Sequence, residues 1–197
     1  MKKGLIIGIV AVVALVGIYF MFSISVKNSI IDKEESVTAQ WSKVESAYQR
    51  RSDLIPNLVN TVKGYADFEQ KTLTQVIEAR SKATSINLKA DDLTPENIQK
   101  FQRAQDQLSG SLSRLLVSVE RYPELKANQN FLELQSQLEG TENRIKVERD
   151  RFGDEVKIFN AYIRKFPGRL FADDLGVERK GYFESVEGSE VAPEVTF

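Results

Sequence analysis

Residues 98–122 read IQKFQRAQDQLSGSLSRLLVSVERY, and they carry the clearest helical pattern of this 197-residue chain. Their apolar side chains recur at steps of three, four or seven residues, interrupted only by Gln105: Ile98, Phe101, Leu108, Leu112, Leu115, Val119 and Tyr122. This spacing places one apolar stripe along one side of an α-helix. Thr94 and Pro95 provide a cap and a first-turn proline, and Pro123 ends the helix. The segment therefore predicts a helix that must pack against other helices.

Two segments earlier in the chain show the same period. The first covers residues 30–55, and its apolar members are Ile30, Val37, Trp41, Val44, Tyr48 and Ile55. The second is expected to begin with Asp53 as its N-cap and Pro56 in its first turn, where a missing N–H costs little. It carries an apolar stripe as far as about Thr84: Leu58, Val62, Tyr65, Leu73, Val76 and Ala83.

A last helix is expected over residues 128–166, with Asn128 or Asn130 as its N-cap and with Pro167 and Gly168 at its end. Its stripe consists of Phe131, Leu134, Leu138, Ile145, Phe152, Val156, Phe159, Ile163 and Phe166. No alternating pattern typical of strands competes with these four one-sided segments. The sequence therefore predicts an all-α fold, an antiparallel up-and-down four-helix bundle preceded by one N-terminal transmembrane helix.

The expected transmembrane helix is the run Leu5–Ile24, which contains no charged residue and follows Lys2 and Lys3. A helix of this length matches the hydrocarbon layer of a bilayer, about 30 Å. The two lysines favour an N-terminus inside the cell, whereas Lys27 and Lys33 on the other flank oppose this orientation. We therefore expect a single-pass protein of the cell membrane whose soluble domain lies outside the cytoplasm, with the opposite orientation left open.

The alternative for this run is a cleaved signal peptide. Such a peptide has an apolar stretch of roughly 7–15 residues and small residues at the cleavage site. This run is longer and ends in Tyr19, Phe20, Met21 and Phe22, so we favour an uncleaved anchor. No glycine or proline occurs between Gly17 and Pro56, so the anchor is expected to continue directly into the first bundle helix.

These patterns divide the chain into three parts. Residues 1–27 form the anchor with its short basic N-terminus, and residues 28–183 form the bundle. The bundle includes a C-terminal extension that is too apolar to remain unfolded and is expected to pack against the helices. Residues 184–197 are expected to form a flexible tail.

The composition excludes several classes of function. The chain has no cysteine and no histidine, which excludes thiolate and Ser–His catalysis and makes a zinc site improbable. Its net charge of −1 provides no general attraction for nucleic acid. No motif supports carboxylate or lysine chemistry either. We therefore expect no enzymatic activity, no cofactor, no metal and no nucleic-acid partner.

Several polar side chains interrupt or flank the apolar stripes and form the candidate site: Arg51, Gln105, Glu142, Asn143, Arg144, Arg149 and Asn160. One interpretation is a buried polar network that sets the register of the helices. The other is a ligand-binding cleft lined by arginine and carboxylate. In either case a buried arginine needs an acceptor, because an unpaired charge in a core is very costly. Glu142 and Glu148 are the nearest candidates by residue type.

Longer strings resemble those of the LemA family. They include QWSKVE at 40–45, YQRRSDLIPNLV at 48–59, VKGY at 62–65, EAR at 78–80, YPELKAN at 122–128 and GTENRI at 140–145, followed by Phe159-Asn160 and Phe166-Pro167. The resemblance implies a bacterial protein with one N-terminal membrane helix and an antiparallel helical bundle, and it brings no catalytic residues. Phe152-Gly153 departs from the Tyr-Asn more frequent in that family, which weakens any functional role for this position.

Together these observations predict a membrane-anchored, non-enzymatic interaction or scaffold module at the bacterial cell envelope. Its expected partners are the lipid bilayer, through Leu5–Ile24, and an envelope protein, and self-association is left open. The alternative function is a sensory or ligand-binding module that uses Arg51, Glu142 and Arg149 as a polar group.

Overall fold

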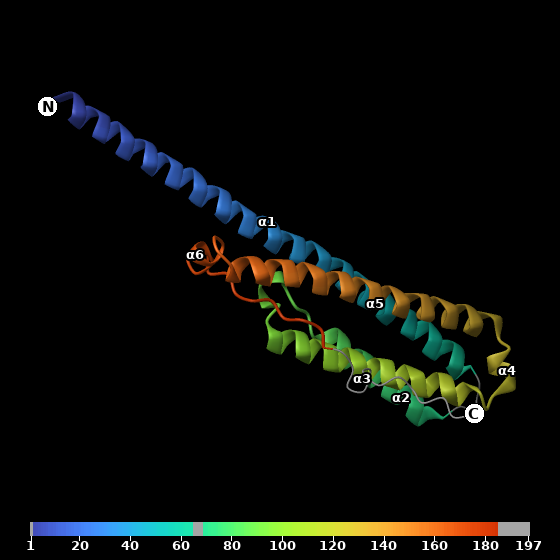
Figure 1. Cartoon of the computed structure of the whole chain (residues 1–197). Helices are drawn as coiled ribbons and strands as arrows, with labels where there is room; N and C mark the ends of the chain where they lie inside the picture. The colour runs from blue at the N-terminus through green and yellow to red at the C-terminus, as the bar shows by residue number, and fades with distance from the viewer. Residues whose placement is uncertain (1, 65–68, 185–197) are drawn as a thin grey trace, which may run out of the picture.

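The computed structural model describes residues 2–64 and 69–184, and its longest element is the first helix. Helix α1 (Lys2–Lys63) has 62 residues and therefore extends about 93 Å. Its N-terminal part projects beyond the rest of the molecule, and its C-terminal part is packed among the other helices (Figure 1). The side chains of residues 3–22 are exposed, whereas Val26 and Ile30 are buried. The expected continuity between anchor and bundle is therefore present.

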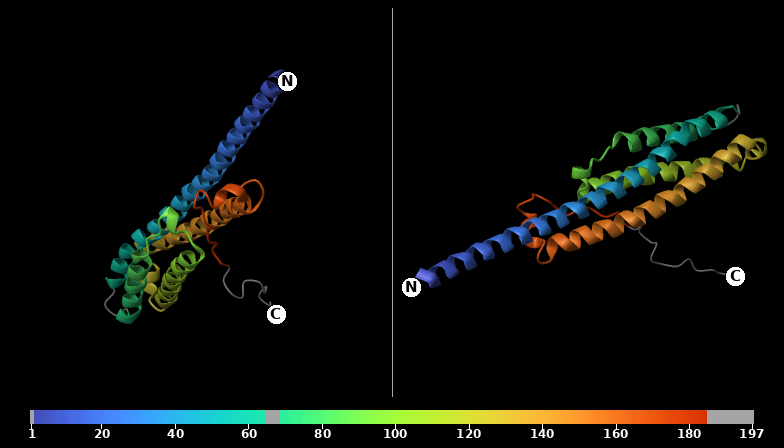
Figure 2. Two further views of the ribbon diagram at one scale, coloured as in Figure 1. Left: turned by 90° about the vertical axis from the view of Figure 1, so that its left-hand side faces the viewer. Right: turned by 90° about the horizontal axis from the view of Figure 1, so that it is seen from above.

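The remaining helices run alternately away from and towards the projecting end of α1 (Figures 1 and 2). They are α2 (Gln70–Ser85), the 3-10 helix η1 (Ala90–Asp92), α3 (Pro95–Val119), the short α4 (Pro123–Lys126), α5 (Gln129–Arg164) and the short α6 (Arg169–Ala172). The most extensive pairings are α1 with α5 and α2 with α3. The described residues contain no strand, so the all-α prediction is confirmed.

The second helix predicted from Asp53 to about Thr84 is wrong, because residues 53–63 belong to α1 and α2 begins only at Gln70. Asp53 is not an N-cap, because α1 continues through Pro56 and ends at Lys63. Proline cannot donate to the carbonyl four residues before it, which here belongs to Ser52. The Arg80 Nε on α2 donates to that carbonyl oxygen instead, at 2.9 Å. A side chain from a neighbouring helix thus satisfies the acceptor that the proline leaves free. Tyr65, expected on the second stripe, lies outside the described residues.

Two of the three helix starts predicted from cap residues, those at Thr94 and Asn128, are confirmed. The Thr94 hydroxyl accepts from the N–H of Asn97 at 3.3 Å, and the Asn128 side chain accepts from the N–H of Phe131 at 3.1 Å. Helix α5 ends at Arg164, two residues before the predicted end. The side chain of Phe166 is exposed and does not continue the stripe.

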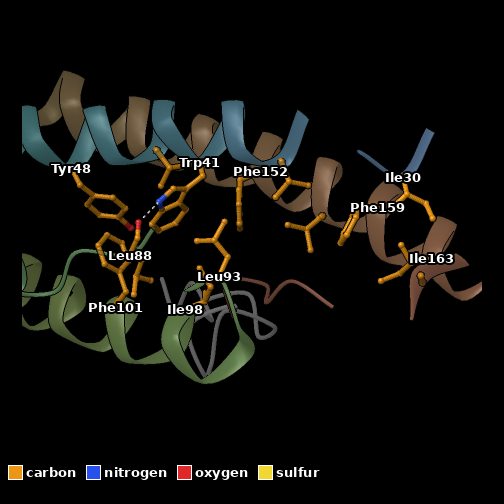
Figure 3. Close-up of a cluster of buried hydrophobic side chains, with 14 of the residues drawn as sticks. Ile30, Trp41, Tyr48, Leu88, Leu93, Ile98, Phe101, Phe152, Phe159 and Ile163 are labelled. Carbon is orange, nitrogen blue, oxygen red and sulfur yellow. Dashed lines mark hydrogen bonds between the residues drawn. The ribbon is translucent and has the colours of Figure 1, made fainter. Parts of the chain in front are cut away.

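The core has two parts. The half nearer the projecting end joins α1 and α5 to the α2–α3 connection and the C-terminal extension. The far half joins the ends of α1 and α5 to α2, α3 and α4. In the nearer half, Trp41 makes ring contacts with Phe101 and Phe152, and its indole N–H donates to the carbonyl of Leu88 at 3.1 Å (Figure 3). The tryptophan thereby holds the α2–α3 connection against α1.

The C-terminal extension packs against the helices, as expected. Phe183 lies among the rings of Trp41, Phe101 and Phe152, with centroid distances of 5.6–6.4 Å. Glu184, which the sequence places at the start of the flexible tail, is held by its main chain against α3. The rest of the expected tail, residues 185–197, lies outside the described residues.

Candidate functional site

The centre of the predicted polar group is Arg51, whose side chain is only 1% exposed. Its guanidinium donates to Glu142 Oε1 and Ser109 Oγ, both at 2.7 Å, and to Gln105 Oε1 at 2.6 Å. It also lies over the ring of Tyr48, 5.0 Å from the centroid. The site therefore joins α1, α3 and α5 through one cation. The expected pairing of Arg51 with Glu142 is present.

The two charges of this ion pair have unequal surroundings. The Glu142 side chain is 44% exposed, and only the Arg51 side is fully removed from water. Gln105 also donates to the carbonyl of Ala83 at the end of α2, so the network reaches a fourth helix. Burial raises the pKa of the Tyr48 phenol, although Arg149 and Arg51 partly oppose this effect. The phenol is therefore neutral at pH 7.

Arg149 is not part of this ion pair. It lies over the Phe183 ring at 4.4 Å and donates to the carbonyl of Glu184. Together with Glu142 it lines an open groove of about 690 Å³ between α5 and the C-terminal extension. Arg51 is not among the lining residues. The predicted group of Arg51, Glu142 and Arg149 is thus divided into a buried pair and a separate surface contact.

Asn160 serves the C-terminal extension. Its side-chain amide donates to the carbonyl of Lys180 at 2.9 Å and accepts from the Lys180 N–H at 3.0 Å. Lys180 in turn pairs with Glu34 at 2.7 Å. Glu34 on α1 therefore has a structural partner more than a hundred residues away in the chain.

Gln102 makes an equivalent two-point contact that the sequence analysis missed. Its side-chain amide accepts from the Glu184 N–H at 2.8 Å and donates to the Glu184 carbonyl at 2.9 Å. Between the two amides, the Gly181 N–H donates to the carbonyl of Leu93 at 2.8 Å. A β-carbon at Gly181 would lie 2.7 Å from Pro95, so only glycine fits there. No periodicity marks such contacts, because an extended segment has no helical stripe.

The other predicted site residues do not join the Arg51 network. Asn143 and Arg144 are exposed, and Arg144 lies 3.9 Å from Glu148. Glu148 is buried and accepts from the Gln40 side chain at 2.8 Å. This second buried acceptor joins α1 to α5 independently of Arg51. The interruptions of the stripes therefore form several separate contacts between helices.

These contacts offer no evident chemistry. Within residues 2–64 and 69–184, no three Asp, Glu, His or Cys side chains gather in a way that could hold a metal ion. The most deeply buried cation has its carboxylate, amide and hydroxyl acceptors within the protein. What the arrangement does physically is to join the four long helices and the extension in one register.

Helix α1 is also the one described helix that is long and apolar enough to cross a membrane. The chain is also similar in sequence to several known proteins. The chain is 23% identical to the LemA protein of Metamycoplasma hominis over 87% of this chain and 75% of that protein. It is 24% identical to magnetosome protein MamQ 2 of Paramagnetospirillum magneticum, over 91% of this chain and 71% of that protein. The MamQ protein of Magnetospirillum gryphiswaldense is likewise 24% identical, over 79% and 64% of the two chains.

None of these relatives carries the name of an enzyme. The profile of the LemA family matches residues 40–197, which include the C-terminal part of α1 and all the helices after it. The match covers most of the chain and agrees with the all-α bundle and the membrane-compatible first helix. The chain therefore belongs to the LemA family.

Proposed function

We propose that this protein is a non-enzymatic interaction module that a single transmembrane helix holds at the bacterial cell envelope, with the bundle outside the cytoplasm. The observation that carries the proposal is the unbroken helix α1, in which exposed apolar turns continue directly into the buried core of the bundle. A rigid connection of this kind sets the distance and direction at which the bundle is presented to other proteins.

The internal contacts support a role in binding rather than catalysis. Arg51, Glu148 and Asn160 all have partners within the protein. Reaction sites instead present nucleophiles, bases or metal ligands to a cleft.

The outer face of α5 carries the half-exposed apolar side chains Val147 and Ile158, three helical turns apart. They offer a place where a helix of an envelope protein could bind.

The test is photo-crosslinking in intact membranes. A photoreactive amino acid replaces Val147 or Ile158 in the full-length protein, and crosslinked products are isolated under denaturing conditions and identified. A discrete product that depends on these positions is expected, with Lys100 as the exposed control position. A set of products identical to that from position 100 would contradict a specific interface on α5. A product of twice the protein's own mass would identify self-association.

A second candidate function is ligand binding in the groove between α5 and the extension. The specific observation is that three basic side chains line this groove beside four acidic ones: Lys146, Arg149 and Lys157 with Glu142, Asp150, Asp154 and Glu184. A small charged molecule bound there at 100 times its dissociation constant would stabilise the protein by about 2.7 kcal/mol. A thermal-shift screen of anionic and zwitterionic metabolites against the wild type and Arg149→Ala therefore tests it. A shift that disappears in the variant supports binding, and no shift with any compound excludes it for the compounds screened.

A further inference from the structure

The end of the bundle next to the projecting part of α1 carries an unusual set of exposed side chains. We call residues 164–174 the membrane-proximal corner; they comprise the end of α5, α6 and the turns around it (Figure 1). Phe166 is 75% exposed and Leu170 is 62% exposed. Arg164, Lys165 and Arg169 are exposed beside them. Large apolar and basic side chains thus alternate on one short segment.

The corner contacts α1 on both sides of the end of the apolar run. Phe171 makes an edge contact with Phe22, with centroids 6.4 Å apart, and the Lys27 ammonium lies 5.9 Å from the Phe171 ring. Lys27 also forms an ion pair with Asp174. Phe22 lies two residues inside the end of the Leu5–Ile24 run, which is about 3 Å along the helix axis. The corner is therefore at the same level as the boundary of the expected transmembrane segment.

This level has a specific chemistry. The headgroup region adds about 5–7 Å on each side of the hydrocarbon layer, and aromatic residues concentrate there. Basic side chains near the surface are attracted to anionic lipids. Of the two acidic residues in the corner, Asp174 is paired with Lys27, which leaves Asp173 opposed by Arg164, Lys165 and Arg169. The corner therefore presents a net positive charge together with two exposed apolar side chains.

From this juxtaposition we propose that the membrane-proximal corner is a second membrane contact. Phe166 and Leu170 enter the headgroup region, and Lys165 and Arg169 bind anionic lipid headgroups. The proposal rests on the membrane-spanning role of α1. Its consequence is that the protein touches the bilayer at two points, the transmembrane helix and the corner, and these two points determine the tilt and rotation of the bundle over the membrane.

The absence of cysteine from the sequence makes the test direct. Single cysteines replace Leu170, Phe166, Val117 or Val13 in the full-length protein, and each carries an environment-sensitive fluorophore. Val117 is the matched control, because it is 71% exposed and lies on α3 near the opposite end of the bundle. Each labelled protein is reconstituted in vesicles of phosphatidylcholine with or without phosphatidylglycerol. Quenching by aqueous iodide is then compared with quenching by nitroxide-labelled lipid.

We expect the labels at 166 and 170 to be quenched by the lipid and to show several-fold less iodide quenching than the label at 117. We also expect the protection from iodide to be greater in vesicles that contain phosphatidylglycerol. The Lys165→Glu/Arg169→Glu variant should show equal protection in both kinds of vesicle. Equal iodide quenching at 170 and 117 would overturn the second contact. Protection that is the same in both kinds of vesicle would overturn the anionic-lipid assignment.

The label at position 13 separates this inference from the proposed anchor. If position 13 is protected from iodide and position 170 is not, the anchor stands and the second contact fails. If position 13 is also accessible to iodide, the transmembrane role of α1 fails as well.

Discussion

At the scale of single residues, the unequal burial of Arg51 and Glu142 makes their contributions to stability unequal. Removing the half-exposed Glu142 leaves a buried cation without its carboxylate, and breaking a buried pair in this way costs about 3–5 kcal/mol. Arg51→Met instead removes the buried charge, and water can then hydrate the Glu142 carboxylate. The main cost is that the Gln105 side-chain oxygen loses its donor, which destabilises the protein by about 1–3 kcal/mol. Urea unfolding of the soluble domain should therefore rank Glu142→Ala as the more destabilising change.

The control for this pair is Glu139→Ala, an exposed carboxylate on the same helix. It should change the free energy of unfolding by less than about 0.5 kcal/mol. The double variant Arg51→Met/Glu142→Ala should be more stable than Glu142→Ala alone, because no buried charge remains. A larger loss of unfolding free energy in Arg51→Met than in Glu142→Ala would contradict this ranking.

The two-point contact of Asn160 with Lys180 predicts a local effect. Asn160→Leu removes both hydrogen bonds at similar side-chain volume and should destabilise the protein by about 1–3 kcal/mol, because two main-chain groups lose their partners. Hydrogen exchange should accelerate in residues 177–184 and stay unchanged in α2. Asn143→Leu on the exposed face of α5 is the matched control. Acceleration spread equally over all helices would indicate that the extension and the bundle unfold together.

At the scale of elements, the course of α1 through Pro56 depends on Arg80. Arg80→Ala should leave the Ser52 carbonyl without a donor and cost about 1–3 kcal/mol. Pro56→Ala restores an N–H that can reach the same carbonyl, so Arg80→Ala should cost less in that background. A double-mutant cycle by chemical denaturation measures the difference. Purely additive effects would mean that Arg80 and Pro56 act independently.

The junction of anchor and bundle is also a property of one element. Helix α1 is unbroken between Ile24 and Glu35, and the Ser29 hydroxyl donates to the Ser25 carbonyl within it. Amide hydrogen exchange of the full-length protein in lipid should therefore show continuous protection across this region, because every amide N–H there has a helical acceptor. Fast exchange confined to Lys27–Ser29, with slow exchange on both sides, would instead make the junction a hinge.

At the scale of the whole molecule, the membrane helix and the bundle overlap. The full-length protein should remain with membranes after carbonate washing, whereas a chain that begins at Ser25 should be soluble and folded. A chain that begins at Asn28 lacks the buried Val26 and the ion pair of Lys27 with Asp174. It should therefore be less stable by about 1.5–3 kcal/mol, mainly from the loss of the buried valine. Fractionation and thermal unfolding compare the three proteins, and equal stability of the two truncated chains would place the start of the bundle after Lys27.

Features with a local physical cause follow from the amino-acid sequence alone. The apolar stripes predict the helical class, the cap residues Thr94 and Asn128 predict the starts of α3 and α5, and the charge-free run predicts a helix able to cross a bilayer. These features could be predicted because helical period, capping and hydrophobic length involve neighbours within a few residues.

Features that depend on distant partners are set by the packing of the folded chain. Arg80 supplies the donor that lets α1 pass through Pro56, Arg149 belongs with Phe183 rather than with Arg51, and Gln102 holds Glu184. In each case the partner lies at least twenty-eight residues away in the chain. A polar side chain on a stripe shows that a buried acceptor or donor must be satisfied, but the packing of the helices selects which group satisfies it.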